Sequence, residues 1–282
     1  MEPAGRLTDC GDRRSAGGRQ RQAILLGGLG GATYGCFLEN CLVTQNSAAE
    51  GGGMHGGGPR NCAITHNSGD DYCAVALGTL VNCTVTDNYR RPDRLPFFGP
   101  GAVDSCKLTN CIVYFNQPPL NTHNWNTLSY CCLDFDPGGA GNITLDPQLA
   151  SAGHLSANSP CRGLGQPAPK SGVDIDGEAW GNPPSIGCDE YHAGAVTGEL
   201  SVGVRLSTTN EVAVGQSISL VALIGGHANA SVWDFGDGAR ATNQPFTSHS
   251  WRTPGVFTVT LWAFNESHPE GVSATSLVRV VQ

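Results

Sequence analysis

One heptapeptide recurs four times in this chain of 282 residues, and its repetition limits the folds that the first half can adopt. The pattern is N-C-x-[VI]-[TY]-x-N, and its copies begin at Asn40, Asn61, Asn82 and Asn110. The successive steps are 21, 21 and 28 residues long. Self-similarity at such a period indicates a solenoid of stacked coils, in which each repeat buries its apolar side only against its neighbours.

Alternation within the heptapeptide predicts short strands. Successive side chains of a strand point to opposite faces, so the Cys and the Val or Ile of each copy share one face. Coils stacked ~4.8 Å apart would align these residues in ladders. The expected internal cysteine ladder consists of Cys41, Cys62, Cys83 and Cys111.

The asparagine that closes each heptapeptide marks the place where the chain has to turn. Asn tolerates the left-handed backbone, and stacked side-chain amides can hydrogen-bond from coil to coil. We therefore expect a second ladder at these turns. Its members are Asn46, Asn67, Asn88 and Asn116.

The repeats favour an all-β fold, with a short right-handed parallel β-helix of about four to five coils over residues 30–130. Leucine-rich repeats have a similar period but need a denser Leu pattern than this chain contains. The composition agrees with this choice, because Gly and Pro are poor helix formers and the chain has 39 Gly and 17 Pro.

Two segments depart from the regular repeat. Residues 1–29 are expected to form a degenerate first coil or a disordered N-terminus. A signal peptide is the weaker alternative, because only four apolar residues follow the basic ones. The longer step between the third and fourth coils places a loop within residues 89–100. A tolerated insertion explains this loop, and a grafted functional loop is the alternative.

The repeated residues resemble the right-handed β-helix repeat family found in large bacterial secreted and surface proteins. Further along, four segments resemble the closing part of proteins described as choice-of-anchor type. These segments are Gly141–Pro147, Asn158–Gly163, Asp174–Trp180 and Ser185–Tyr191. The resemblance implies that residues 131–194 form the C-terminal cap of the β-helix. A solenoid needs a cap, because its last coil otherwise exposes apolar surface and strand edges.

A second module follows a linker at residues 195–198. Residues 199–282 contain alternating strands at the spacing of a β-sandwich. Within them, the segments Trp233–Gly238 and His249–Leu261 closely resemble the signatures of the polycystic-kidney-disease-type (PKD) domain, an immunoglobulin-like module. Trp251 stands where that family usually has Tyr, so the position stays aromatic.

The residues of these two signatures fit a sandwich core and its turns. Trp233 and Phe235 alternate towards the expected core, and Trp251 supplies a further ring. Asp237-Gly238 and Pro254-Gly255 are turn dipeptides. We therefore expect these seven positions to be structural.

The cysteines and aspartates of the chain are its candidates for metal binding and for disulfides. The cysteine ladder is interpreted as a column of small apolar side chains, because each coil offers a single inward thiol. We expect no cofactor, with calcium at Asp234 and Asp237 as the alternative to a plain turn. Asp174-x-Asp176-Gly177 resembles part of a calcium loop but lacks its other ligands. Cys161 and Cys188 flank the cap and are candidates for a disulfide, which would fit an oxidising compartment.

No catalytic residues are expected. Glycosidases need paired carboxylates, and on a β-helix these would project from one outer face of neighbouring coils. The outward positions of the repeated strand carry no carboxylate. They are Leu42, Thr44, Ala63, Thr65, Thr84, Thr86, Ile112 and Tyr114. A neighbouring outer column of Tyr34, His55, Ala76 and Asp104 matches neither the glycosidases nor the calcium-dependent lyases.

The net charge and the hydropathy of the chain argue against two kinds of partner, nucleic acids and membranes. A net charge of -8 argues against nucleic-acid binding, which needs a basic face. No apolar run reaches the length of a membrane span. Weakly charged modules rich in Thr and Asn suit polysaccharides or other surface proteins better.

The leading hypothesis is an extracellular or cell-surface structural or adhesion protein that contacts carbohydrate or protein without catalysis. The alternative is a pectate-lyase-like polysaccharide lyase or a glycoside hydrolase, truncated, with the PKD-type domain as an accessory module. The absence of an evident signal peptide does not argue for the cytoplasm, because the chain start can lie inside a longer parent protein.

Overall fold

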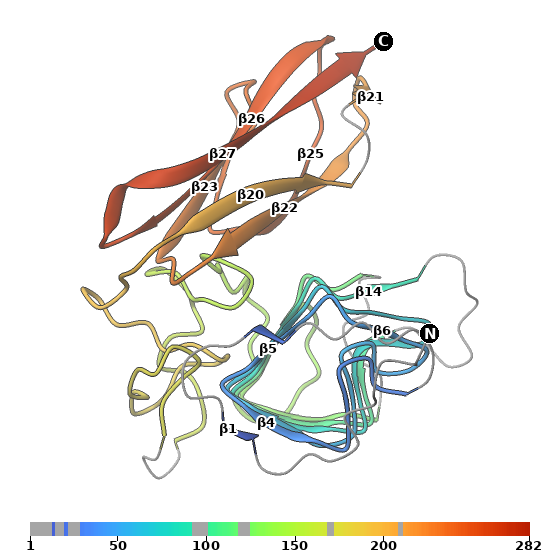
Figure 1. The fold of residues 1–282 in the computed structure, drawn as a ribbon, viewed down its shortest axis with the longest axis vertical. Helices are drawn as coiled ribbons and strands as arrows, with labels where there is room; N and C mark the ends of the chain where they lie inside the picture. The colour runs from blue at the N-terminus through green and yellow to red at the C-terminus, as the bar shows by residue number, and fades with distance from the viewer. Residues whose placement is uncertain are drawn as a thin grey trace, which may run out of the picture. The chain divides into compact units, whose positions relative to one another are not determined.

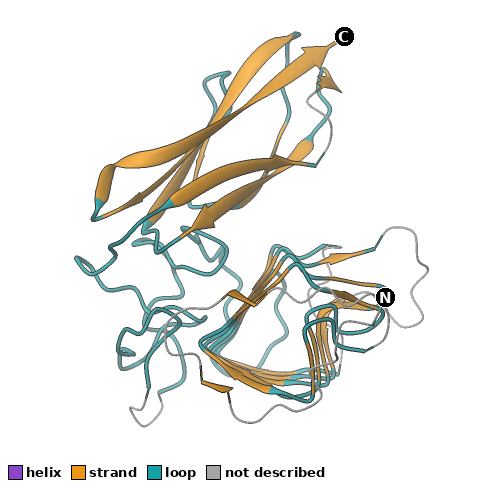
Figure 2. Ribbon diagram, in the orientation of Figure 1, coloured by secondary structure: helices purple, strands orange, loops and turns teal. Residues whose placement is uncertain are grey.

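The computed structural model shows a chain that divides into two compact units, Met1–Pro147 with Pro160–Glu190, and Gln148–Ser159 with Tyr191–Gln282. No helix occurs in the part of the chain that the structure describes, as Figure 2 shows, so the expected all-β class is confirmed. Most of residues 1–29, and residues 92–100 of the expected loop, lie outside the described residues. The described residues are 13–14, 20–21, 29–91, 101–117, 125–167, 172–207 and 211–282.

Within the described residues of the first unit, short strands from successive repeats form four parallel sheets (Figure 1). The sheet that we call the face sheet consists of β1 (Arg13–Arg14), β4 (Phe37–Glu39), β8 (Gly58–Arg60), β12 (Thr79–Val81), β16 (Lys107–Thr109) and β18 (Thr127–Ser129). The repeat sheet, which contains the heptapeptides, consists of β2 (Gln20–Arg21), β5 (Leu42–Thr44), β9 (Ala63–Thr65), β13 (Thr84–Thr86), β17 (Ile112–Tyr114) and β19 (Cys132–Leu133).

Two smaller sheets complete each turn of the chain. One consists of β3 (Thr33–Tyr34), β7 (Met54–His55), β11 (Tyr72–Ala76) and β15 (Gly101–Asp104). The other consists of β6 (Ser47–Ala48), β10 (Ser68–Gly69) and β14 (Tyr89–Arg90). Near the N-terminus, β1 pairs with β4 and β2 pairs with β5, which is the pairing expected of a further coil.

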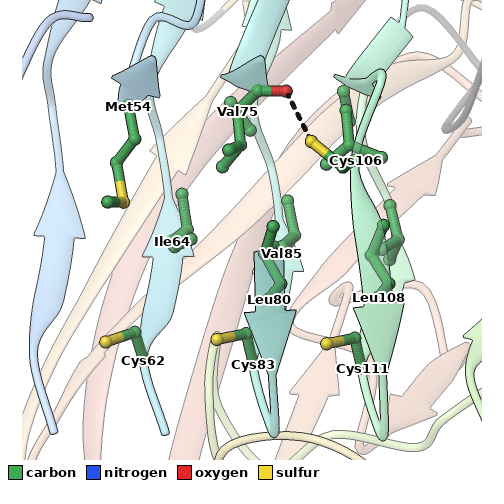
Figure 3. Packing of buried hydrophobic residues seen from close by; sticks show 14 of the residues in the cluster. Met54, Cys62, Ile64, Val75, Leu80, Cys83, Val85, Cys106, Leu108 and Cys111 are labelled. Atoms are coloured by element: carbon green, nitrogen blue, oxygen red, sulfur yellow. Dashed lines mark hydrogen bonds between the residues drawn. The ribbon is translucent and has the colours of Figure 1, made fainter. Parts of the chain in front are cut away.

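The repeat sheet keeps the heptapeptides in register. Equivalent positions in neighbouring strands are Leu42, Ala63, Thr84, Ile112 and Cys132. The cysteine before each of these positions therefore stacks on the cysteine of the next coil. Figure 3 shows the side chains of Cys62, Cys83 and Cys111 in one row. Cys41 and Cys131 extend this row, and all five are buried.

The closing asparagines form a continuous hydrogen-bonded ladder. Oδ1 of Asn67 accepts the backbone N–H and the side-chain amide of Asn46, at 3.1 and 2.9 Å. Asn88 accepts the same two bonds from Asn67, both at 2.9 Å, and Asn116 accepts them from Asn88, at 3.0 and 2.9 Å. Each bond joins one coil to the next, so the ladder links four coils within the buried part of the unit.

The left-handed backbone lies one residue earlier than the sequence predicts. The closing asparagines are not among the residues with positive φ. The side chain of each closing asparagine takes part in the hydrogen bonds of the ladder, and the residue before it adopts the left-handed backbone conformation. Those residues are Gln45, His66, Asp87 and Phe115, with φ between 48° and 58°. The opening asparagines of the heptapeptides, at positions 40, 61, 82 and 110, also have positive φ.

The expected cap, residues 131–194, divides into parts with different positions. Residues 140–143 close the last coil. The Leu133 amide donates to the carbonyl of Ile143 at 3.0 Å, the Ile143 amide donates to the carbonyl of Cys131 at 2.9 Å, and Oδ1 of Asn142 accepts the Cys131 amide at 2.9 Å. This short segment therefore satisfies the edge that the last strand of the repeat sheet would otherwise expose.

Residues 160–167 and 172–190 instead lie along the side of the stack, and we call them the covering segment. The Cys188 amide donates to Oγ1 of Thr84 at 3.0 Å, and the Gly187 amide donates to the carbonyl of Asn110 at 2.9 Å. Gly187 has φ 114°, and an added Cβ there would lie 2.8 Å from Cδ1 of Ile112. The covering segment therefore buries part of the outward face of the repeat sheet, including Thr84 and Ile112.

The second unit is a β-sandwich. One sheet consists of β20 (Ser201–Leu206), β22 (Ile218–Gly225) and β25 (Phe246–His249). The other consists of β21 (Glu211–Ala213), β27 (His268–Val281), β26 (Gly255–Asn265), β23 (Ala230–Asp234) and β24 (Arg240–Thr242). A buried cluster that includes Trp233, Phe235 and Trp251 contains side chains from both sheets.

Within the described residues, no helix has the length and hydrophobicity of a membrane-spanning segment.

Candidate functional site

The outward side of the face sheet is open to solvent. Leu80 and Leu108, in the middle of their strands, point into the core, so the residues on either side of them point outward. These outward residues form two columns, which we call the exposed sheet face. They are Phe37, Gly58, Thr79, Lys107 and Thr127 in one column, and Glu39, Arg60, Val81, Thr109 and Ser129 in the other.

An aromatic ring covers part of this face. The side chain of Phe37 is 68% exposed. Its ring lies over Gly58 of the next coil, since a Cβ added to Gly58 would lie 2.8 Å from ring atoms Cδ1 and Cε1. The absence of a side chain at Gly58 therefore leaves room for the ring on the neighbouring strand.

Two more large apolar side chains lie at the corner beside the exposed sheet face. Leu77 is 57% exposed and Trp125 is 72% exposed. The two occupy equivalent corner positions two coils apart, because Thr79 pairs with Lys107 and Lys107 pairs with Thr127. The strand spacing places their backbones ~10 Å apart along the stack. Exposed apolar groups thus recur along the same direction in which the coils stack.

The exposed sheet face has a mixed polar chemistry. Its hydroxyl groups come from Thr79, Thr109, Thr127 and Ser129, and its charges come from Glu39, Arg60 and Lys107. Opposite charges are interspersed among hydroxyls, so the face has no strong charge of one sign. The Phe37 ring can stack on a ring of an elongated neutral ligand, and the hydroxyl groups can form hydrogen bonds with the same ligand.

Three members of the predicted outer column, His55, Ala76 and Asp104, are buried in the structure, and the column makes ring and polar contacts. The Tyr34 ring stacks on the His55 ring, with centroids 5.1 Å apart, and Nε2 of His55 lies 3.7 Å from Oε2 of Glu50. Asp104 accepts a hydrogen bond from the Ser105 hydroxyl at 2.8 Å.

Burial raises the pKa of Tyr72 to about 12, and the nearby Asp104, Asp71 and Glu50 carboxylates act in the same direction. Tyr72 thus keeps its proton at neutral pH. The sequence reasoning missed Tyr72 and Glu50, because both lie outside the repeated columns.

The cysteine ladder has the chemistry of an apolar column. Burial raises the pKa of Cys62, Cys83 and Cys111 well above the ordinary value for a thiol. The thiolate is the form that attacks electrophiles and binds metals. These thiols therefore stay protonated at neutral pH, as small buried side chains do.

The predicted core residues of the second module are buried together. Trp233 and Trp251 are fully buried, and each indole N–H donates at 3.0 Å, to the carbonyls of Gln244 and Phe235. The polar edge of each ring is thereby satisfied. Gly238 has φ 93°, a conformation that favours glycine, and Gly255 follows Pro254 as the first residue of β26.

A polar hollow of about 600 Å³ lies beside this core. Nε2 of His249 lies 2.8 Å from Oδ2 of Asp237, and the His249 ring stacks on Phe235 with centroids 4.1 Å apart. The hollow is lined by Ser217, Asp237, Ala239, Ser248, His249, Ser250, Arg252 and Thr253. The serines and Thr253 provide hydroxyl groups and Arg252 provides a guanidinium. After the exposed sheet face, the hollow is a second surface that can hold a polar ligand.

The two aspartates considered for calcium hold the turn by hydrogen bonds. Oδ1 of Asp234 accepts the Gly236 amide at 2.9 Å, and its Oδ2 accepts from Arg240 at 3.0 Å. Oδ1 of Asp237 accepts the Ala239 amide at 3.0 Å. Each of these three carboxylate oxygens thus accepts a hydrogen bond from a protein donor. Calcium binding at this turn stays a prediction.

The Asp237–His249 pair predicts an acid dependence of stability. Partial burial raises the pKa of Asp237, but hydrogen bonds from His249 and from the Ala239 amide outweigh it and lower the pKa. A lowered folded-state pKa stabilises the fold above the unfolded value of ~3.9, and this contribution is lost as the pH falls through the folded value. Urea unfolding should therefore show Asp237→Asn less stable than the parent near neutral pH, with the difference shrinking below about pH 4. Glu270→Gln, an exposed change on β27, is the control, and a difference that does not vary with pH would contradict the assignment.

Comparison with known families identifies the second module. Residues 203–279 match the family model of the PKD domain. This region is therefore a PKD domain, as the resemblance of its two signatures implies. The chain matches none of the curated proteins.

Solved structures provide further likenesses. The PKD1 domain of Vibrio anguillarum Epp is 21% identical with a TM-score of 0.25, over 29% of this chain and 92% of that chain. The PKD domain of the human VPS10 domain-containing receptor SorCS2 is 20% identical with a TM-score of 0.26, over 42% of this chain and 94% of that chain. A structure concerned with the promiscuous specificity of β-sandwich carbohydrate-binding modules is 22% identical with a TM-score of 0.26, over 29% of this chain. The chain spans 34% of the length of that last structure.

Proposed function

We propose that this chain is an extracellular binding and adhesion protein that holds a neutral polysaccharide on its exposed sheet face. The observation that carries this proposal is the set of solvent-exposed apolar side chains, Phe37, Leu77 and Trp125, spaced along the stack among threonine hydroxyls. The repeating unit of the surface is one coil, ~4.8 Å high, which is close to the length of one pyranose unit. A sugar chain that runs along the stack therefore meets one pair of outward face residues at each step.

The proposed architecture follows the sequence interpretation. Residues 30–130 are a right-handed parallel β-helix, and residues 131–194 are its cap, which covers both the last coil and one side of the stack. Residues 195–198 are a linker, and residues 199–282 are the PKD module. Four parallel sheets with one strand per coil support the β-helix. The PKD domain supports an extracellular setting, in which such modules are typical.

The exposed sheet face supports binding rather than cleavage. Its only carboxylate is Glu39, whereas glycoside hydrolysis needs a pair of carboxyl groups. The three charged residues of the face are also of mixed sign, which favours a neutral polymer over a polyuronate.

A panel of polysaccharides tests the proposal. We expect affinity electrophoresis of the full chain to show retardation by one or more neutral polysaccharides, with and without calcium. Parallel assays should detect no new reducing ends and no unsaturated products. Cleavage of any polymer would favour the lyase or hydrolase alternative. The absence of retardation by every polymer would overturn the proposal and leave a surface protein as the partner to be sought.

A further inference from the structure

Cys132 differs from the thiols of the cysteine ladder in the direction that it faces. It occupies the same column as Thr84 and Ile112, which is the outward column of the repeat sheet. Its neighbour Cys131 takes the inward, ladder position, where its thiol donates to the carbonyl of Ser129 at 3.3 Å. Alternation along a strand therefore places one thiol of this Cys-Cys pair inside the stack and the other under the covering segment.

The residue that meets Cys132 there is Cys161, at the start of the covering segment. Both side chains are fully buried, and their thiols hydrogen-bond to each other. The Cys132 thiol also contacts the carbonyl of Leu145, at 3.3 Å. Both cysteines are reduced in the structure.

The sequence offers Cys161 and Cys188 as candidates for a disulfide, and in the structure they are not bonded to each other. Cys188 is also a reduced thiol. Its amide donates to Oγ1 of Thr84 at 3.0 Å, and its thiol hydrogen-bonds to the same side chain. Thr84 lies two coils from Cys132, which is ~10 Å along the stack. Cys161 and Cys188 thus pack against different coils.

We propose that Cys132 and Cys161 become a disulfide when the chain folds in an oxidising compartment. Each thiol gives up its proton, the two sulfurs form one S–S bond, and the electron pair reduces a disulfide oxidant such as oxidised glutathione to two thiols. The compartment is the one that the proposed function requires, so the biological setting of the bond rests on that proposal, although the chemistry does not.

The disulfide would attach the covering segment to the last coil. It closes a loop of about 30 residues, long enough for a substantial loss of freedom in the unfolded chain. Hydrogen bonding to Cys161 and burial both raise the pKa of Cys132, so the folded thiol is a poor nucleophile. Oxidation is therefore expected during folding, before the covering segment buries both sulfurs.

Refolding of the full chain tests the inference. The protein is unfolded and reduced, then refolded with oxidised and reduced glutathione or with dithiothreitol, and mapped as peptides under non-reducing conditions. The glutathione sample should yield a peptide pair that links Cys132 to Cys161, and Cys188→Ala should yield the same pair. Two outcomes of oxidative refolding would overturn the inference. One is a link between Cys161 and Cys188, and the other is the recovery of Cys132 and Cys161 as unlinked peptides.

Thermal unfolding gives a second readout. The oxidised parent should unfold about 5 to 10 °C above its dithiothreitol form. Cys36 is already disulfide-bonded in the structure, so dithiothreitol reduces that bond too. Cys132→Ser, Cys161→Ser and the double variant should therefore each lose the same part of the redox-dependent shift, whereas Cys188→Ala should keep the whole of it. Polysaccharide retardation measured on both redox forms separates the two proposals, because the disulfide can form without sugar binding and sugar binding can persist without the disulfide.

Discussion

Replacement of Asn88 by Ala is expected to lower the free energy of unfolding of the first unit by about 3 to 5 kcal/mol. Asn88 is fully buried. Its Oδ1 accepts two bonds from Asn67, and its Nδ2 donates to the carbonyls of Ile64 and Thr86 at 2.9 and 3.1 Å. Alanine would leave these donors and acceptors without partners in a place that water does not reach, which costs more than the loss of an exposed hydrogen bond.

Urea unfolding followed by far-ultraviolet circular dichroism measures this loss, and hydrogen exchange assigns it to the coils around Asn88. Thr79→Ala is the matched control, because Thr79 lies on the preceding face-sheet strand and is exposed. Its effect should stay within about 0.5 kcal/mol. Equal effects of the two substitutions would show that the ladder does not stabilise the stack.

The repeated heptapeptide predicted a large part of the first unit. A strict period of two along each strand, together with a regular step between copies, determines which side chains stack, and the structure places Cys41, Cys62, Cys83 and Cys111 in one column. The exact turn position was not predictable in the same way. Asparagine favours the left-handed backbone, but at the closing position the hydrogen bonds of its side chain take precedence, and residues such as His66 adopt the bend instead.

The covering segment could not be located from the sequence. Its contacts with Thr84 and Asn110 join residues far apart in the chain, and no periodic pattern marks them. One signal for the Cys132–Cys161 contact was present, since two adjacent cysteines in a strand must face opposite sides. The position of Phe37 was also predictable, because the same alternation places it on the outward side together with Glu39, two residues further along β4.

The PKD module was predictable for a different reason. Its two signatures combine core aromatics with turn residues, so Trp233, Trp251 and Gly238 each have a requirement that few other residues meet. The polar hollow next to them was not predicted, because its lining comes from strand β25 and from several loops that the sequence does not show to be neighbours.

The double variant Phe37→Ala/Trp125→Ala should bind the polysaccharide found in the panel at least ~10-fold more weakly than the parent. Central aromatic side chains of an interface each cost about 1 kcal/mol or more when truncated, and two such losses multiply in the binding constant. Because both side chains are largely exposed, the thermal midpoint should not change.

Isothermal titration of the full chain with that polysaccharide is the most direct measurement. The control is Val256→Ala/Leu277→Ala, which removes two exposed apolar side chains of the PKD module that are 68% and 55% exposed. Sugar binding on the exposed sheet face predicts parental affinity for this control and the ~10-fold loss only for Phe37→Ala/Trp125→Ala. Parental affinity in the Phe37→Ala/Trp125→Ala variant, or an equal loss in both variants, would contradict it.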